Sequence, residues 1–212
     1  MDKELLHQLE TPCVVLDTRM AEENIKKMQA ACDACGVKLR PHIKTHKMPL
    51  FAKMQLAAGA DGVTCAKVGE AEVMADGGVE DIFIAYPMVG AFRVRRVIAL
   101  AKRLRRLILG VDSMEIAQPL SAAAQEAGIT LEVRLEVDTG AKRTGVERDK
   151  AAALAVAINA LPNLKLTGIY TFKSLVYHDA PTLDNAVLLE SATHLADALE
   201  KYAADLATAS SL

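Results

Sequence analysis

The chain of 212 residues is 51% hydrophobic and 25% charged, and this composition excludes a disordered protein. Its 25 Lys and Arg and 27 Asp and Glu give a formal net charge of -2, which argues against a protein that binds nucleic acid or a membrane surface. No apolar stretch approaches the length of a membrane span, and residues 1–10 contain no signal-peptide core. We therefore expect a cytoplasmic protein with no nucleic-acid or membrane partner.

Short runs rich in β-branched residues alternate with longer helical stretches along the chain. Strands are predicted, in chain order, at Thr11–Leu16, Val37–Lys44, Gly62–Ala66, Asp81–Tyr86, Arg106–Val111, Thr130–Val137 and Leu164–Thr171. Helices are predicted from Asp17 or Thr18 to Gly36, and then at Leu50–Ala58, Val68–Asp76, Phe92–Lys102, Ser113–Ala127, Lys150–Ala160 and about Leu183–Leu206. This alternation is typical of an α/β fold, in which helices lie outside a parallel sheet.

Two ways of closing such a sheet compete. An open, doubly wound sheet that binds a dinucleotide carries a GxGxxG motif after its first strand, and the sequence has none there. From Val37 onward the chain contains about six βα units, whereas a TIM-type barrel has about eight. The sequence therefore predicts a TIM-type (β/α) barrel with about six of the eight βα units present.

The CxxC pair formed by Cys32 and Cys35 suggests either a reactive site or part of the core. A redox pair usually opens a helix, where the dipole lowers the thiol pKa, but this pair lies at a predicted helix end. No second CxxC completes a zinc site. Because both cysteines continue the helical spacing of Ile25 and Met28, we interpret them as small buried hydrophobes of an apolar stripe.

Residues 40–47 read RPHIKTHK and form the most informative stretch of the sequence. In a strand, Lys38, Arg40, His42 and Lys44 share one face, which would point into the barrel and place Lys44 near the C-terminal mouth. Burial and crowding there lower the pKa of an amine, as a nucleophile or a Schiff-base former requires. A solvated strand or loop is the competing interpretation. A metal site at HxxxH is disfavoured because the segment contains a proline and a β-branched isoleucine, which oppose a helix.

The predicted strand Thr130–Val137 has one apolar face and one mostly acidic face. The apolar face consists of Leu131, Val133, Leu135 and Val137, and the other face of Glu132, Arg134, Glu136 and Asp138. If the second face points inward, its carboxylates could neutralise the basic row; a surface strand is the alternative. The turn that follows, DTGAKRTG, has two glycines that permit tight bends, so Arg143 could reach over the barrel mouth to a ligand's oxygens. The alternative is an exposed surface turn.

Four motifs in this order, TPCVVLD, RPHIKTHK, DTGAKRTGV and GIYTF, resemble the fold-type III pyridoxal-phosphate enzymes. The closest resemblance is to the branch of D-threonine aldolase and D-serine dehydratase, which is related to the N-terminal barrel of alanine racemase. It implies that Lys44 forms a Schiff base with pyridoxal 5'-phosphate and that Arg143 hydrogen-bonds the ring oxygen of this cofactor. It also places Tyr170 and Phe172, at the end of the GIYTF strand, beside the pyridine ring.

The chain departs from the racemase pattern at two of the implied positions. Phe172 stands where the racemases have a histidine that stacks on the ring, so it can stack but cannot hydrogen-bond. Met48 stands where they have a tyrosine that binds the phosphate, which leaves His42 and His46 as candidates for that role.

The resemblance implies a pyridoxal-phosphate-dependent lyase or racemase that acts on a small amino acid, with a D-amino acid favoured. Residues 1–212 would form the N-terminal part of the cofactor-binding barrel. The last barrel units, a β-rich C-terminal domain, the phosphate-binding loop and the ligands of a divalent metal would lie outside this chain, and the full-length enzyme is expected to be a homodimer. Because an incomplete barrel leaves strand edges open, we expect the isolated chain to be unstable or aggregated.

Two other functions compete with this one. A non-catalytic protein that binds pyridoxal phosphate and serves its homeostasis could use the same barrel and the same lysine. A TIM-type barrel with unrelated sugar-phosphate or aldol chemistry at Lys44 would need no pyridoxal phosphate.

Overall fold

The computed structural model describes residue 4 and residues 7–172. In chain order its elements are α2 (Thr18–Ala34), η1 (Ile43–Thr45), α3 (Pro49–Ala57), β1 (Val63–Cys65), α4 (Val68–Asp76), β2 (Asp81–Ile84), α5 (Ala91–Ala101), β3 (Arg106–Val111), α6 (Met114–Ala127), β4 (Leu131–Glu136), η2 (Arg148–Lys150), α7 (Ala151–Asn159) and β5 (Leu164–Tyr170). The last predicted helix, Leu183–Leu206, falls outside the described residues.

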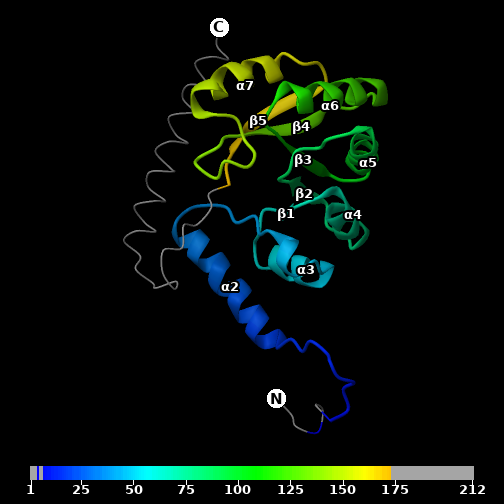
Figure 1. The fold of residues 1–212 in the computed structure, drawn as a ribbon. Helices are drawn as coiled ribbons and strands as arrows, with labels where there is room; N and C mark the ends of the chain where they lie inside the picture. The colour runs from blue at the N-terminus through cyan, green and yellow to red at the C-terminus, as the bar shows by residue number, and fades with distance from the viewer. Residues whose placement is uncertain (1–3, 5–6, 173–212) are drawn as a thin grey trace.

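The five strands form one parallel sheet in the order β1-β2-β3-β4-β5, so every strand pairs with its neighbours in the sequence. Helices α3 to α7 follow the outer side of the curved sheet (Figure 1). The predicted α/β class and the parallel strands are confirmed. Because all the strands run in the same direction, their carboxyl ends meet at one edge, and in such folds this edge carries the site.

The core lies between the sheet and these helices, and the alternation of β4 shows why. Leu131, Val133 and Leu135 are at most 1% exposed, so the apolar face of this strand is turned to the helices as predicted. Burying each such side chain contributes about 1.5–3 kcal/mol. The opposite face is left with the charged residues, which have to find partners on the inner side of the sheet.

The first predicted strand, Thr11–Leu16, does not form. These residues are irregular and exposed, with Val14 90% exposed, and no described strand pairs with them. A run of β-branched residues becomes a strand only when a neighbouring strand or a core covers it. Here the described part of the molecule supplies neither.

The second predicted strand, Val37–Lys44, is reduced to a single bridge between His42 and Thr64, followed by the 3-10 turn η1. Pro41 lacks an N–H group, so it cannot donate to a ladder. The segment nevertheless lies along the free edge of β1 and accepts two hydrogen bonds of 2.8 Å. Asp61 N–H donates to the Leu39 carbonyl, and Thr64 N–H donates to the Pro41 carbonyl. The sheet thus has one strand fewer than the six counted from Val37.

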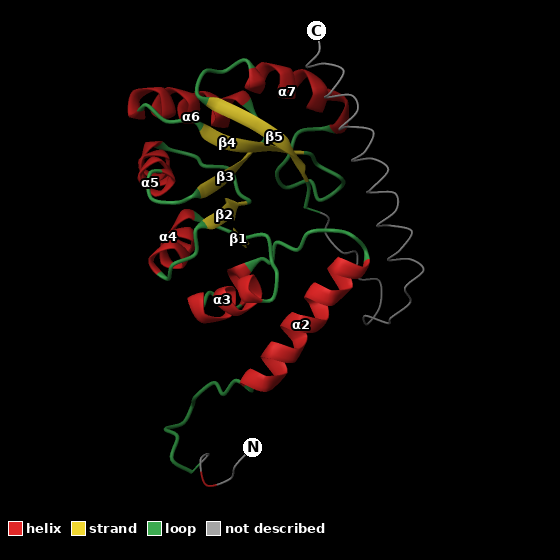
Figure 2. Cartoon of the chain, turned by 180° about the vertical axis from the view of Figure 1, so that it is seen from behind, coloured by secondary structure: helices red, strands yellow, loops and turns green. Residues whose placement is uncertain are grey.

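Helix α2 begins where expected, because the Asp17 carboxylate accepts from the N–H groups of the first turn. The predicted stripe is wrong at two of its four residues. Met28 is 55% exposed and Cys35 is exposed, whereas Ile25 and Cys32 are half-buried and Gln29, outside the predicted stripe, is buried. The side of α2 that packs against the protein is therefore shifted from the side that the cysteine spacing predicts. The helix extends away from the sheet beyond α3 (Figure 2).

Candidate functional site

Lys44, Arg143 and Phe172 meet at the carboxyl-terminal edge of the sheet, although they come from segments far apart in the sequence. The Nζ of Lys44 lies 5.6 Å from the centre of the Phe172 ring, and the Cζ of Arg143 lies 4.4 Å from the same centre. Within the described part of the chain, neither cation forms an ion pair with a carboxylate. Two cations beside one ring, neither in an ion pair with a described carboxylate, favour an anionic ligand at this edge.

The turn η1 presents Lys44 to solvent while its neighbour Ile43 is fully buried in the core. The Nδ1 atom of His42 accepts from the Lys44 N–H at 3.3 Å and so caps this turn. Burial lowers the pKa of His42, and the positive charge of Lys44 lowers it further. His42 is therefore neutral at neutral pH. Lys44 thus extends from a turn and not from the strand face that the alternation predicts.

The loop after β4 is held in shape before it reaches Arg143. Asp138 accepts from the N–H groups of Gly140, at 2.9 Å, and Lys142, at 3.1 Å, and these bonds lower the pKa of its carboxyl. Gly145 has a φ of +99°, and a Cβ atom there would lie 2.7 Å from the Asp138 nitrogen. Only glycine fits this return of the loop to the strand.

Below Arg143, the carboxylate of Glu136 is 3% exposed and receives two hydroxyl donors. Tyr170 donates to one of its oxygens and Thr144 to the other, each at 2.8 Å. Burial and the nearby carboxylate raise the pKa of Tyr170, so the phenol stays protonated. A Cβ atom on Gly110 would lie 2.2 Å from the Tyr170 oxygen, so the phenol occupies the space that this glycine leaves. The hydroxyl of Tyr170, a residue predicted to bind the cofactor, thus donates its hydrogen bond to Glu136.

Glu136 was expected only as one member of an acidic row, and the role of Thr144 could not be anticipated from the sequence. The contact depends on the loop after β4 folding back over the strand, a bend that only the Gly145 conformation reveals. The signal available in the sequence was the threonine-glycine pair next to Arg143.

His46, the second histidine considered for phosphate binding, faces away from this group. Its ring stands edge-on to Phe51 of α3 at 5.7 Å, and its Nδ1 accepts from the Met48 N–H at 3.1 Å. Burial lowers the pKa of this histidine as well. No group of three or more His, Cys, Asp or Glu residues suited to a metal ion occurs among the described residues, and the role of a metal stays a prediction.

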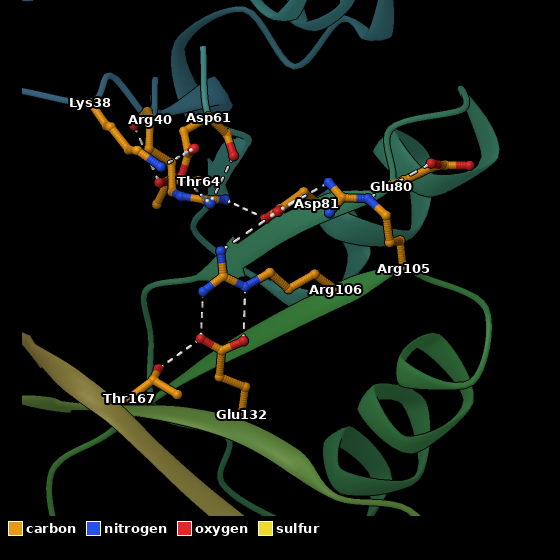
Figure 3. A network of polar contacts seen from close by, with 10 residues as sticks. All are labelled: Lys38, Arg40, Asp61, Thr64, Glu80, Asp81, Arg105, Arg106, Glu132 and Thr167. Atoms are coloured by element: carbon orange, nitrogen blue, oxygen red, sulfur yellow. Dashed lines mark hydrogen bonds and ion pairs between the residues drawn. The ribbon is translucent and has the colours of Figure 1, made fainter.

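Opposite the candidate site, the amino-terminal edge of the sheet carries an ion-pair network (Figure 3). Arg106 contacts both oxygens of Glu132, at 2.8 and 2.6 Å, and this pairing lowers the pKa of the Glu132 carboxyl. Arg40 donates to Asp81 at 2.7 Å. The prediction that the acidic face of β4 neutralises the basic row is therefore wrong. Arg40 of that row pairs with Asp81 of β2, and Glu132 of β4 pairs with Arg106 of β3. Lys38, also predicted to point inward, has an 80% exposed side chain and pairs with Asp61.

These features define an α/β protein of the barrel type whose cationic side chains converge at the carboxyl ends of the strands. Residues 16–211 match the family model for the alanine racemase N-terminal domain. The chain belongs to this family.

Among curated proteins, the chain is 36% identical over 193 residues to a D-threonine aldolase of an Arthrobacter species, which covers 90% of this chain and 50% of that protein. It is 35% identical over 187 residues to a 3-hydroxy-D-aspartate aldolase of Paracoccus denitrificans, covering 87% of this chain and 48% of that protein. The chain therefore spans about half the length of these relatives.

Solved structures give the same result. A D-threonine aldolase from Filomicrobium marinum is 38% identical with a TM-score of 0.73, covering 76% of this chain and 43% of that one. A D-threo-3-hydroxyaspartate dehydratase from a Delftia species is 38% identical with a TM-score of 0.72, covering 78% and 44%. In the part of the chain that the structure describes, no helix has the length and apolar character that crossing a membrane requires.

Proposed function

We propose that this chain carries the lysine-bearing half of a pyridoxal-phosphate-dependent lyase that acts on a small D-amino acid with a hydroxyl group on its β-carbon. The observation that carries the proposal is the convergence of Lys44 and Arg143 on Phe172 without a carboxylate partner among the described residues. The names of the relatives support the substrate class, because they are aldolases and a dehydratase of D-threonine or hydroxy-D-aspartates.

The residues present fit the cofactor by their chemistry. Pyridoxal phosphate is a flat aromatic aldehyde with two anionic groups, so its site needs an amine, cationic donors and an apolar surface. Lys44 provides the exposed amine, Arg143 the donor and Phe172 the flat surface. When bound, the cofactor supplies an electron sink for the negative charge that develops at the substrate's α-carbon.

Each residue of the site has a separate task in this proposal. Lys44 would hold the cofactor through its amine. Arg143 would donate to the ring oxygen and offset negative charge, and Phe172 would pack against the ring and exclude water from it. Neutral His42 stays a candidate for a phosphate oxygen. Tyr170 acts one layer lower, where its bond to Glu136 supports the Arg143 loop through Thr144.

The test is the replacement of Lys44. In the complete enzyme that contains this half, Lys44→Ala should abolish the adduct that borohydride traps with pyridoxal phosphate, and it should abolish turnover of D-threonine, while circular dichroism shows an unchanged fold. Lys53→Ala, which removes an exposed lysine of α3, is the matched control and should keep the adduct. Covalent trapping that persists in Lys44→Ala would contradict the assignment.

The same assay separates the competing functions. A non-catalytic binding protein would trap pyridoxal phosphate at Lys44 and convert none of D-threonine, D-serine or a 3-hydroxy-D-aspartate. A barrel with another lysine chemistry would trap none. Release of an aldehyde would indicate an aldolase, and release of ammonia a dehydratase. The proposal also includes a cytoplasmic location, a homodimer and a divalent metal held by further polypeptide. These assays do not test those three parts.

A further inference from the structure

The segment that carries Lys44 is weakly attached to the sheet by its backbone. It replaces a strand, and among the described residues its backbone accepts two N–H bonds from the β1 side, at Leu39 and Pro41, and a longer bond of 3.4 Å from the Thr64 hydroxyl at the Arg40 carbonyl. A strand of that length would normally be held by a full ladder. The position of Lys44 therefore depends on side chains more than it would in a regular barrel strand.

Arg40 supplies such an attachment four residues before Lys44. Its Nη1 donates to Asp81 Oδ1 at 2.7 Å, and its Nη2 donates to the Asp61 carbonyl oxygen at 3.0 Å (Figure 3). The Arg40 side chain is 12% exposed and that of Asp81 7%. A buried fork that binds two different elements fixes direction as well as distance.

The neighbouring backbone is shaped to admit this guanidinium. Gly62 has a φ of +142°, and a Cβ atom there would lie 2.1 Å from Arg40 Nη1 and 2.8 Å from Asp81 Oδ1. The guanidinium could avoid this overlap only by moving and giving up its hydrogen bonds to Asp81 and Asp61. Gly62 is thus required by the Arg40–Asp81 pair as well as by its own φ angle.

Asp81 is also the point where the network meets the sheet. It is the first residue of β2, and it further contacts Arg105 at 3.2 Å and Arg106 at 3.7 Å. Arg40 therefore attaches to the amino-terminal edge of the sheet, whereas Lys44 lies at the opposite edge beside Phe172. The guanidinium is too far away to touch a ligand there, and any influence on the site passes through the segment that joins the two residues.

We propose that Arg40 is a positioning residue, which fixes the Lys44 turn by attaching its segment to Asp81 and Asp61 in place of a strand ladder. The assignment rests on the proposed function only for what Lys44 does once it is positioned. Arg40 then anchors one end of the segment, and Lys44 at the other end is presented to the ligand.

The experiment compares Arg40→Met with Arg103→Met in the full chain. Arg103 also pairs with an aspartate, but its exposed pair joins the turn after α5 to Asp76 at the end of α4, so it controls for the loss of an arginine–aspartate pair away from the Lys44 segment. Arg40→Met should raise amide hydrogen exchange of residues 43–47 about tenfold, and it should slow trapping of pyridoxal phosphate at Lys44 by a similar factor. Arg40→Lys, which keeps one cation for Asp81, should recover part of both losses. Arg103→Met should change neither.

A second route covers the case in which Arg40→Met does not fold. Gly62→Ala displaces the guanidinium without removing a charge, and it should change residues 43–47 in the same direction. The proposal is overturned if Arg40→Met affects residues 43–47 no more than Arg103→Met does, or if exchange rises equally in all helices. If the unaltered chain traps no pyridoxal phosphate, the proposed function fails, and the exchange contrast still decides the role of Arg40.

Discussion

The two edges of the sheet use the same kinds of residues in opposite ways. At the amino-terminal edge, Arg40 and Arg106 are each matched by a carboxylate at hydrogen-bond distance. At the carboxyl-terminal edge, Lys44 and Arg143 approach one ring, and the described residues give neither an ion-pair partner. A satisfied charge stabilises the fold, whereas an unsatisfied one remains available to a ligand. The amino-terminal edge is therefore the stabilising edge, and the carboxyl-terminal edge is the candidate functional edge.

The largest effect is expected at the stabilising edge. Arg106→Met leaves Glu132 without its two donors from Arg106, so the free energy of unfolding should fall by about 2–3 kcal/mol. Urea denaturation of the full chain measures this change. Arg105→Met, which removes a more exposed neighbour, should cost less than about 1 kcal/mol. Equal losses of unfolding free energy in the two variants would show that the two-bond contact between Arg106 and Glu132 adds no stability beyond that of an exposed ion pair.

A smaller effect, of another kind, is expected at the functional edge. Arg143→Met should weaken binding of pyridoxal phosphate about tenfold to a hundredfold, because one charge-assisted donor is lost. The free energy of unfolding should change by less than about 0.5 kcal/mol, since no described carboxylate pairs with this residue. Absorbance titration measures the binding. Lys142→Met is the control, because it removes a cation from the same loop and leaves the Lys142 backbone N–H bond to Asp138 in place. A similar weakening in that variant would indicate a diffuse positive field instead of a specific donor.

The smallest effect is a pH dependence at His42. Because burial and Lys44 lower its pKa below the ordinary 6.5, the unfolded chain takes up a proton at a higher pH than the folded one. The contribution of His42 to stability should thus be fully present above about pH 6.5 and should be lost as the pH falls from there through the folded pKa. Urea denaturation of His42→Gln across this range should show a weaker decrease than the unaltered chain. Since His46 has a pKa lowered in the same way, part of the decrease should remain. An identical profile in both proteins would contradict the role of His42.

Most of the sheet could be predicted from the sequence because the burial of each strand is decided locally. The alternation in Leu131–Glu136 has one solution, with the apolar residues towards the helices. The two wrong strands, Thr11–Leu16 and Val37–Lys44, lie where the described sheet offers no partner or only one edge. Strand formation there depends on neighbours, and a single segment does not contain that information.

The candidate site divides in the same way. Lys44 and Arg143 could be selected because their motifs have specific spacing, and the structure places both beside Phe172. Their roles stay predictions. Glu136 as the acceptor of two hydroxyls and Arg40 as a partner of Asp81 could not be selected, because both contacts join elements that only the folded chain brings together. The stripe through Cys32 and Cys35 was misplaced since helical spacing identifies a face but not the side that packs.

In the described sheet each strand is bonded only to the strands that come directly before and after it in the chain. Such an array resembles a stack of repeats, whose cohesion is a sum of neighbour-to-neighbour terms. The contact of Lys44 with Phe172 is different, because it joins the segment before β1 to the residue that follows β5. It can form only when every unit between them has the right tilt and register. The distance between Lys44 and Phe172 therefore depends on the whole stack. A defect in a middle unit such as β3 would change this distance without touching any residue of the site.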